Sequence, residues 1–358
     1  ARTLDRLRRD RLGALAADNP DAIELDDMGQ PARRGEILLL GDDEADIATA
    51  RAAGYPPIER VTIAELGLVV TRLRAPEDLP LARAVRRLQR LLPGREITAD
   101  QILLSAGSAS RPAGRTRPAA GTGGTDIAVG IIDSGVAPSI VPAASQRGFA
   151  RRAPLPADHG TAMADLLRHA GARRILVADV YGDDPAGGST LAVVSALAWL
   201  VEERVRVASV SLVGRDNPLL RRAVEAARSR GVVIAAAVGN DGPAAPPAFP
   251  ASYPGVMAVT GVDARNRVLI EAGRAAHLDY AAPAADMVAA GADGRLAEVR
   301  GTSYAVPLVA ARIAHALQSG AAEGWMARLD AEAVDLGRRG PDGTFGRGLL
   351  CASCRRTR

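Results

Sequence analysis

The sequence contains no lysine, few aromatic residues and only two cysteines. All 45 residues counted as lysine plus arginine are arginines, which excludes a lysine Schiff base and the phosphate-binding loop that ends in Gly-Lys-Ser/Thr. Aromatic residues make up 3% of the 358 residues, so the arginines do not alternate with stacking rings as they do on many nucleic-acid-binding surfaces. The net charge is only +4, and we expect no nucleic-acid partner.

Long apolar runs are also absent. Hydrophobic residues make up 47% of the chain, but no run approaches the roughly 18 uninterrupted apolar residues of a membrane-spanning helix. The first residues form an arginine-rich amphipathic stretch rather than a charged and then apolar secretory signal. We therefore expect a globular chain with an aliphatic core and no membrane span within it.

The two cysteines, Cys351 and Cys354, form a CxxC motif near the last residue of the sequence. A zinc site would need a second cysteine pair or a nearby histidine, and neither is present. The sequence leaves open whether these two cysteines form a local disulfide or are free thiols.

A segment rich in glycine, proline and small residues, 106–125, separates two regions of different pattern. We interpret it as a linker between domains at 1–105 and 126–358. The first region predicts strands at 36–40, 58–63, 68–73 and 97–104 and helices at 42–53 and 79–92. This order of elements is typical of a small α+β ferredoxin-like domain.

The second region alternates near-continuous apolar runs with helical patterns. It predicts strands at 127–132, 174–180, 207–212, 232–237 and 256–262 and helices at 161–169, 191–203 and 218–229. Such runs are expected of strands buried on both faces of a sheet. The fold class is therefore α/β, with a doubly wound, mostly parallel sheet whose chemistry lies at the carboxyl ends of its strands.

Four polar residues stand where such a sheet would expose them. Asp133 ends a predicted strand, His159 precedes a predicted helix, Asn240 follows another strand, and Ser303 begins a helical stretch. Each alone has an ordinary explanation, since Asp-Ser-Gly and Asn-Asp-Gly are common turns and a lone histidine is more often on the surface. Acid, base and nucleophile in one α/β pattern together indicate acyl transfer.

The segments IIDSGV, DHGTAMA, AVGNDGPAAPPAFPASYPGVMAVTGVD and GTSYAVPLVAA resemble the bacterial subtilisin-like serine proteases, from residue 127 to about 350. The resemblance implies a serine endopeptidase in which Asp133 orients His159, His159 is the general base and Ser303 is the nucleophile. Asn240 and the backbone N–H of Ser303 would form the oxyanion hole. A subtilisin-like fold, protein or peptide substrates and a periplasmic or secreted location are further implications.

The resemblance also gives the first domain a role. It implies a propeptide that acts as chaperone and intramolecular inhibitor of a zymogen, with segment 97–104 lying in the cleft as a substrate would. Self-processing is then expected near 105–107 or within the linker.

Substrate binding is implied for a further set of residues. These are Ser211, Leu212, Val213, Gly214, Ala237 and Gly239. Val213 departs from the family's usual glycine, so we expect cleavage after small or modest apolar residues, unless the small residues Ala236 and Ala237 restore the lost volume.

Other classes of protein fit the sequence less well. An α/β-hydrolase esterase lacks its Gly-x-Ser-x-Gly elbow here, and a dinucleotide enzyme lacks its glycine motif after a strand. A subtilase-fold binding or regulatory protein, held inactive by its own first domain, stays open. No cofactor is assigned; structural calcium, frequent in this family, is left open, with Asp183-Asp184 as a weak candidate.

Overall fold

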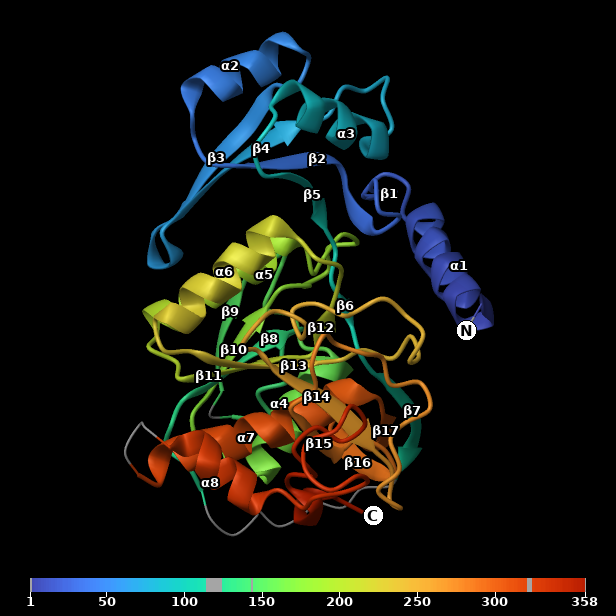
Figure 1. The fold of residues 1–358 in the computed structure, drawn as a ribbon, viewed down its shortest axis with the longest axis vertical. Coiled ribbons are helices and arrows are strands. Elements are labelled where there is room, and N and C mark those ends of the chain that lie inside the picture. The colour runs from blue at the N-terminus through green and yellow to red at the C-terminus, as the bar shows by residue number, and fades with distance from the viewer. Residues whose placement is uncertain (1, 114–123, 143, 321–323, 358) are drawn as a thin grey trace.

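The computed structural model describes residues 2–113, 124–142, 144–320 and 324–357. They form two units packed against each other, which we call the N-terminal unit, residues 2–105, and the C-terminal unit, residues 124–357 with the gaps just given (Figure 1). Within those ranges no helix is long and apolar enough to cross a membrane.

A five-stranded antiparallel sheet forms the N-terminal unit, with the order β1-β2-β4-β3 and with β5 paired to β2. Its strands are β1 (Ile23–Leu25), β2 (Pro31–Leu40), β3 (Pro57–Ile63), β4 (Leu68–Arg74) and β5 (Ile97–Gln101). Helices α2 (Glu44–Ala52) and α3 (Leu81–Leu91) pack on the face that carries Ile37 and Leu39. The sequence pattern predicts this β-α-β-β-α-β core, because the apolar residues of each segment recur with the period of its element.

The arginine-rich stretch at the start forms a further helix, α1 (Arg2–Asp18), which the sequence pattern did not single out as an element. It precedes the sheet and lies beside the C-terminal unit (Figure 1). Its Leu12 is buried.

A seven-stranded parallel sheet forms the C-terminal unit, in the order β15-β14-β13-β11-β8-β10-β9. The strands are β8 (Val129–Asp133), β9 (Ser145–Gly148), β10 (Ile175–Asp179), β11 (Val207–Val210), β13 (Val233–Ala237), β14 (Met257–Val262) and β15 (Tyr280–Pro283). After β8 the chain forms β9 and β10 on one side of it and then crosses to β11 on the other side, so the strand order reverses beside β8. In doubly wound folds the functional crevice lies at such a reversal.

Helices cover both faces of this sheet, which confirms the predicted doubly wound α/β class. They are α4 (Asp158–His169), α5 (Thr190–Glu202), α6 (Pro218–Ser229), α7 (Ala305–Gln318) and α8 (Trp325–Glu332). Successive side chains of β8 point to opposite faces. Ile131 packs in the core that contains α4 and α7, and Ile132 packs in the core that contains α5 and α6.

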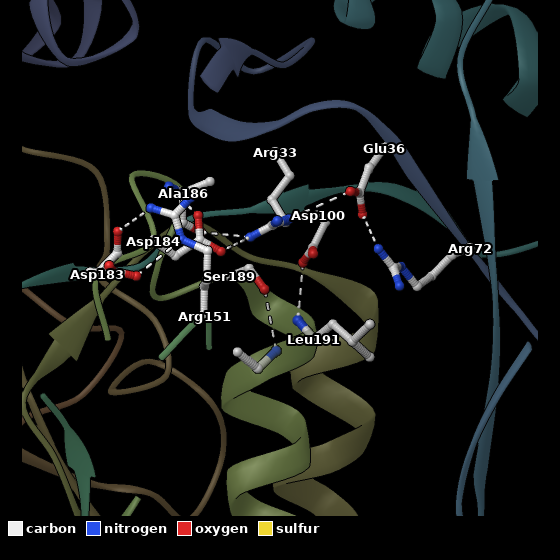
Figure 2. A network of polar contacts seen from close by, with 11 residues as sticks. Arg33, Glu36, Arg72, Asp100, Arg151, Asp183, Asp184, Ala186, Ser189 and Leu191 are labelled. Carbon is white, nitrogen blue, oxygen red and sulfur yellow. Dashed lines mark hydrogen bonds and ion pairs between the residues drawn. The ribbon is translucent and has the colours of Figure 1, made fainter. Parts of the chain in front are cut away.

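The outer face of the N-terminal sheet lies on α5 and α6 (Figure 1). Leu38 and Val70 of that sheet belong to the same buried cluster as Val193 and Leu220 of the helices. Polar contacts at the helix starts complete the interface: Asp100 accepts the N–H of Leu191 at 3.0 Å, in the first turn of α5 (Figure 2).

The first part of the predicted linker is ordered, which differs from our expectation for 106–125. Just before the predicted linker, Leu104–Ser105 form the short strand β6; within it, Ser108–Ala113 form strand β7 on the edge of β17 (Leu296–Arg300). The backbone hydrogen bonds to the edge of β17 stabilise this strand, so its low strand propensity does not prevent pairing. Residues 114–123 of the predicted linker lie outside the described residues, whereas Thr125 at its end forms a parallel bridge with Ala172.

Cys351 and Cys354 form a disulfide. The chain segment after it is held by a buried ion pair between Arg356 and Asp165 of α4. The last residues described are thereby tied to the helix that begins beside His159.

Candidate active site

The His159 ring lies within hydrogen-bond distance of both Asp133 and Ser303. The Nδ1 of His159 lies 2.9 and 3.0 Å from the two carboxylate oxygens of Asp133, and its Nε2 lies 3.1 Å from the Oγ of Ser303. A carboxylate only accepts hydrogen bonds, so Nδ1 carries the proton and Nε2 is left to accept from the serine hydroxyl.

Three different elements position these groups. Asp133 is the fully buried last residue of β8, His159 is the second residue of α4, and Ser303 lies in the 3-10 turn Thr302–Tyr304 directly before α7. Asp133 is also held by the backbone N–H of Ser134, at 2.8 Å. The carboxyl end of a strand and the starts of two helices therefore meet at one point.

The electrostatic environment favours a basic imidazole. Burial of the His159 ring opposes its protonation, but the Asp133 carboxylate, through its charge and its hydrogen bond, outweighs burial and raises the pKa of His159 above its usual value. The imidazolium that forms when His159 accepts a proton is thus stabilised from within the site.

Two donors converge on one backbone carbonyl. The N–H of Ser303 donates to the oxygen of Ala106 at 3.0 Å, and the Nδ2 of Asn240 donates to the same oxygen at 2.5 Å. The Oδ1 of Asn240 accepts the N–H of Thr302 at 3.0 Å, which fixes the orientation of the amide. The carbonyl of Ala106 therefore occupies the place that an oxyanion hole provides for a reacting carbonyl.

The peptide bond between Ala106 and Gly107 lies beside the Oγ of Ser303. A Cβ added to Gly107 would lie 2.1 Å from the Oγ of Ser303 and 3.0 Å from the Nε2 of His159. Gly301, at φ +138°, makes room on the other side, because a Cβ there would come within 2.9 Å of the Ala106 oxygen. A side chain at either glycine would collide with this arrangement.

The residues before Ala106 form an antiparallel pair with the C-terminal unit. Leu104 and Ser105 lie opposite Val213 and Leu212, and the N–H of Ala106 donates to the carbonyl of Ser211 at 3.0 Å. On the other side of the segment the N–H of Leu103 donates to the carbonyl of Gly188 at 2.8 Å. The stretch in the cleft is thus 103–106, whereas most of the expected 97–104 belongs to β5 and pairs with β2.

Val213 narrows the space beside Ala106. A Cβ built on Gly239 would lie 3.5 Å from a methyl of Val213 and 3.8 Å from the Cβ of Ala248, so both side chains converge on this glycine. Ala236 and Ala237 are fully buried in the two cores on either face of the sheet and add no volume here. Gly214 makes room for the buried Leu103, whose Cγ would lie 3.1 Å from an added Cβ.

Three contacts in the site were not expected from the sequence. The hydroxyl of Tyr181 donates to the carbonyl of Leu103 at 2.8 Å, and the ring of Tyr304 lies 5.6 Å from the ring of His159. Arg8 and Arg11 of α1 pair with Asp241, the residue after Asn240, at 3.1 and 2.7 Å. Among these residues, Tyr304 and Asp241 lie inside the motif segments of the sequence, whereas Tyr181, Arg8 and Arg11 do not.

A cavity of about 330 Å³ lies between α1 and the cleft, lined among others by Arg8, Leu12, Ala106, Val213 and Asn240. It connects the helix to the oxyanion side of the site, so α1 is part of the surroundings of the cleft.

The aspartates considered for calcium are engaged otherwise. Asp184 pairs with Arg33 at 2.8 Å, and Asp183 pairs with Arg151 and Arg152 (Figure 2 shows the first two pairs). Among the described residues, no group of three or more His, Cys, Asp or Glu side chains is placed to hold a metal ion.

The sheet is doubly wound and parallel, and an aspartate, a histidine and a serine form one hydrogen-bonded series at its edge. This combination of fold and site is typical of the subtilisin-like serine hydrolases. Residues 124–348, more than half of the chain, match the model of the subtilase family, and the chain belongs to that family.

Known proteins agree with this assignment. The minor extracellular protease Epr of Bacillus subtilis (strain 168) is 29% identical over 248 residues, which are 64% of this chain and 38% of that protein. Subtilisin BL of Lederbergia lenta is 31% identical over 217 residues, 56% of this chain and 78% of that protein. The chain spans 65% of the alkaline protease of Shouchella clausii, so it matches only part of the length of several relatives.

Solved structures share the fold at lower identity. Fervidolysin from Fervidobacterium pennivorans, a keratinolytic enzyme related to subtilisin, superposes with a TM-score of 0.70 at 16% identity, over 93% of this chain and 63% of that one. The epidermin leader peptide processing protease of Staphylococcus aureus, solved as its S393A mutant, gives 0.65 at 13% identity, over 88% and 97%. The predicted subtilisin-like fold is confirmed.

Proposed function

We propose that this protein is a serine endopeptidase that cleaves its own chain between Ala106 and Gly107. The observation that carries the proposal is the Ala106 carbonyl, which receives both oxyanion donors while Ser303 stands beside the adjoining bond. Family membership and relatives named as proteases support the same activity.

The geometry gives each group a task. His159 takes the proton of Ser303 as the oxygen attacks the carbonyl carbon, and Asp133 holds the imidazole in the required tautomer. The negative charge that develops on the carbonyl oxygen is met by Asn240 and the N–H of Ser303. His159 then protonates the departing amine, and water releases the acyl group by the reverse sequence of proton transfers.

We further propose that the chain is a zymogen and the N-terminal unit its inhibitor. Segment 103–106 fills the cleft by backbone pairing, and after cleavage it would remain there as a bound product. Protein or peptide substrates follow from the endopeptidase activity. A secreted or periplasmic location is in keeping with the relative named as an extracellular protease.

Self-cleavage gives the sharpest test. The unaltered chain should yield two fragments, the first ending at Ala106 and the second beginning at Gly107. A fluorophosphonate probe should label Ser303 once the N-terminal fragment has dissociated. Ser303→Ala and His159→Ala should stay intact and folded, with similar, very large losses of turnover. Ser319→Ala, an exposed serine at the end of α7, is the matched control and should cleave normally. Cleavage of Ser303→Ala at the parent's rate would refute the mechanism.

Asn240→Ala separates transition-state stabilisation from substrate binding. The amide acts mainly on the oxyanion, so kcat on a peptide substrate should fall about a hundred- to a thousandfold with little change in KM. A tenfold rise in KM with unchanged kcat would contradict the role proposed for Asn240.

A subtilase-fold binding or regulatory protein is the second candidate. The observation that favours it is the occupied cleft, since residues 103–107 fill the site in the intact chain. This candidate predicts an intact chain that never cleaves and a Ser303 that is not labelled even when the N-terminal unit is removed by another protease.

A further inference from the structure

The guanidinium of Arg215 is a partly buried cation without a counter-ion among the described residues. Arg215 follows the short strand β12 (Leu212–Val213) and lines the cavity between α1 and the cleft. Its Nη1 is enclosed and has no hydrogen-bond partner, and no carboxylate in the described part of the chain forms an ion pair with it. Because burial costs a charge its hydration, this position lacks an anionic acceptor.

A second guanidinium reaches the same cavity from the N-terminal unit. Arg8 of α1, whose side chain is 13% exposed, lines this space of about 330 Å³ together with Arg215. Its Nε donates to Asp241 at 3.1 Å and its Nη2 donates to Gln30 at 2.7 Å. Burial, and after it the charge of Arg8, lower the pKa of Arg215. Two like charges therefore lie near each other where water screens them only in part.

The nearby carboxylates are engaged with other groups. Asp216 pairs with Arg221, and Asp26 accepts two backbone N–H groups and the Nε2 of Gln101. Asp241 is shared by two arginines of α1. Among the described residues that line the cavity, the charged ones are four arginines and two acids: Arg8, Arg11, Arg215, Arg300, Asp241 and Glu271. The cavity therefore carries an excess of positive charge.

We propose that this cavity binds a small tetrahedral oxyanion, of the class of sulfate and inorganic phosphate, between Arg215 of the C-terminal unit and Arg8 of the N-terminal unit. A guanidinium presents a planar fork of N–H donors that matches the oxygens of such an ion. The cavity has room for the ion and for bridging water, since a water molecule takes about 30 Å³. The bound ion supplies Arg215 with the acceptor that its surroundings lack and offsets the repulsion between the two arginines.

The site requires both units. Because Arg8 belongs to the N-terminal unit, the site is lost when that unit dissociates, and it is not part of the substrate-binding surface of the released enzyme. An ion that binds only the associated units stabilises their association by mass action. The oxyanion is then an effector that delays release of the N-terminal unit. This effector role rests on the proposed zymogen function, whereas binding of the ion does not.

Binding is measured on an intact chain, so that it does not depend on self-cleavage. The Ser303→Ala chain is titrated with inorganic phosphate in a calorimeter, alone and with Arg215→Gln, Arg8→Gln or Arg339→Gln added. Arg339 is an exposed arginine that does not line the cavity, and its variant is the control for the loss of one positive charge. We expect one saturable site, with an affinity about tenfold or more lower in the first two variants and unchanged in the control, because hydrogen bonds between charged groups are lost.

Competition between ions separates a site from general screening. Sulfate should displace phosphate, whereas chloride at the same ionic strength should not. No phosphate binding by the Ser303→Ala chain, equal affinity in all four chains, or equal displacement by chloride would each overturn the site and leave the peptidase function standing.

Thermal unfolding distinguishes ion binding from a packing role of Arg215. Without phosphate, the Arg215→Gln chain should unfold at the same temperature as its parent or at a higher one, because an unpaired, partly buried charge is removed. With phosphate, the parent and the Arg339→Gln control should gain more than the Arg215→Gln chain. A lower unfolding temperature of Arg215→Gln without phosphate, together with equal gains in all three chains, would assign Arg215 to packing and overturn the proposal.

The self-cleaved complex tests the effector role. At a phosphate concentration about ten times the dissociation constant, the N-terminal fragment should bind about tenfold more tightly than in chloride of equal ionic strength. With Arg215→Gln the fragment should bind equally in both solutions. Phosphate binding without this difference in the parent would show that the ion does not bridge the two units and would overturn the proposal. A chain that binds phosphate through both arginines but never cleaves itself would refute the proposed self-cleavage and leave the oxyanion site standing.

Discussion

Val213 limits the space beside Ala106. Its side chain and that of Ala248 converge on Gly239, and a close-packed wall has no slack for a larger group. We expect a peptide library to show cleavage after alanine and similar small residues, with large aromatic residues disfavoured. Val213→Gly should raise kcat/KM for phenylalanine at that position about tenfold relative to alanine. A strong preference for phenylalanine or tyrosine in the parent, unchanged in the variant, would refute this role.

Asp100 makes the affinity of the N-terminal unit for the C-terminal unit depend on pH. The side chain is buried between the N-terminal sheet and the start of α5, beside Arg33 and Glu36 (Figure 2). Burial raises the pKa of this carboxyl to about 6 from the ordinary 3.8. Because the bound state takes up the proton more readily, protonation strengthens the hold. This contribution is complete below the ordinary pKa and is lost as the pH rises through about 6.

The N-terminal fragment of the self-cleaved chain should therefore dissociate more readily at pH 7 than at pH 4, by up to about a hundredfold for a shift of two units. Asp100→Asn keeps an oxygen that accepts the N–H of Leu191 but cannot ionise. This variant should hold the fragment more tightly at pH 7 and lose this part of the pH dependence. The difference between parent and variant isolates Asp100 from Glu36, Arg33 and Asp184 nearby. Identical pH profiles would show that Asp100 does not act in this way.

At the scale of elements, α1 connects the N-terminal unit to the oxyanion side of the cleft. Arg8, which is 13% exposed, and Arg11 share the carboxylate of Asp241. Ion pairs that lose part of their hydration are less screened by salt than fully exposed ones. The helix therefore joins the N-terminal unit to the C-terminal unit at Asp241, in addition to the contacts with α5 and α6.

Replacing both arginines by alanine should speed release of the N-terminal fragment about tenfold and reduce the salt dependence of that release. Arg6→Ala, an exposed arginine on the same helix, is the control and should behave like the parent. Dissociation followed after dilution into 0.05 and 0.5 M salt, with about these concentrations bracketing physiological screening, gives the measurement. Equal rates for parent and double variant would mean that α1 contributes no hold.

The sequence predicts those helices and strands whose apolar residues recur on the face that is buried. The α6 helix has the predicted bounds, Pro218–Ser229, because Asn217 caps it and its leucines and alanines recur on one face. The Asp133, His159 and Ser303 positions were predictable because strand ends and helix starts meet at one edge of a parallel sheet. Their catalytic roles stay a prediction until the variants are measured.

Other features depend on partners distant in the chain. Strand β7 carries small residues without alternation, and β17, which pairs with it, lies almost 200 residues further on. Helix α1 was visible only as an arginine-rich stretch, since its partner Asp241 is 230 residues from Arg11. The Tyr181 hydroxyl likewise acquires its role from Leu103, which only the folded chain brings near.

On the scale of the whole molecule, if the link after Ala106 is cut as proposed, the N-terminal unit keeps contacts in several regions of the described chain, among them the sheet on α5 and α6, segment 103–106 in the cleft, and α1 on Asp241. We expect both fragments of the self-cleaved chain to elute together in size-exclusion chromatography at micromolar concentration, with peptidase activity that rises on dilution. Separate elution under these conditions, with full activity from the moment of cleavage, would contradict an inhibitory N-terminal unit.

Cutting at Gly107 also has an analytical consequence in a chain without lysine. No side chain in residues 1–358 carries a primary amine, so each cut creates one new α-amine against a background free of ε-amines. Its ordinary pKa of about 8 makes it reactive toward acylating dyes near neutral pH. The amount of dye bound therefore measures the number of self-cleavage events. The reaction of the Gly107 amine with the dye should be slow while this amine lies beside Ser303 and fast once the strand has dissociated.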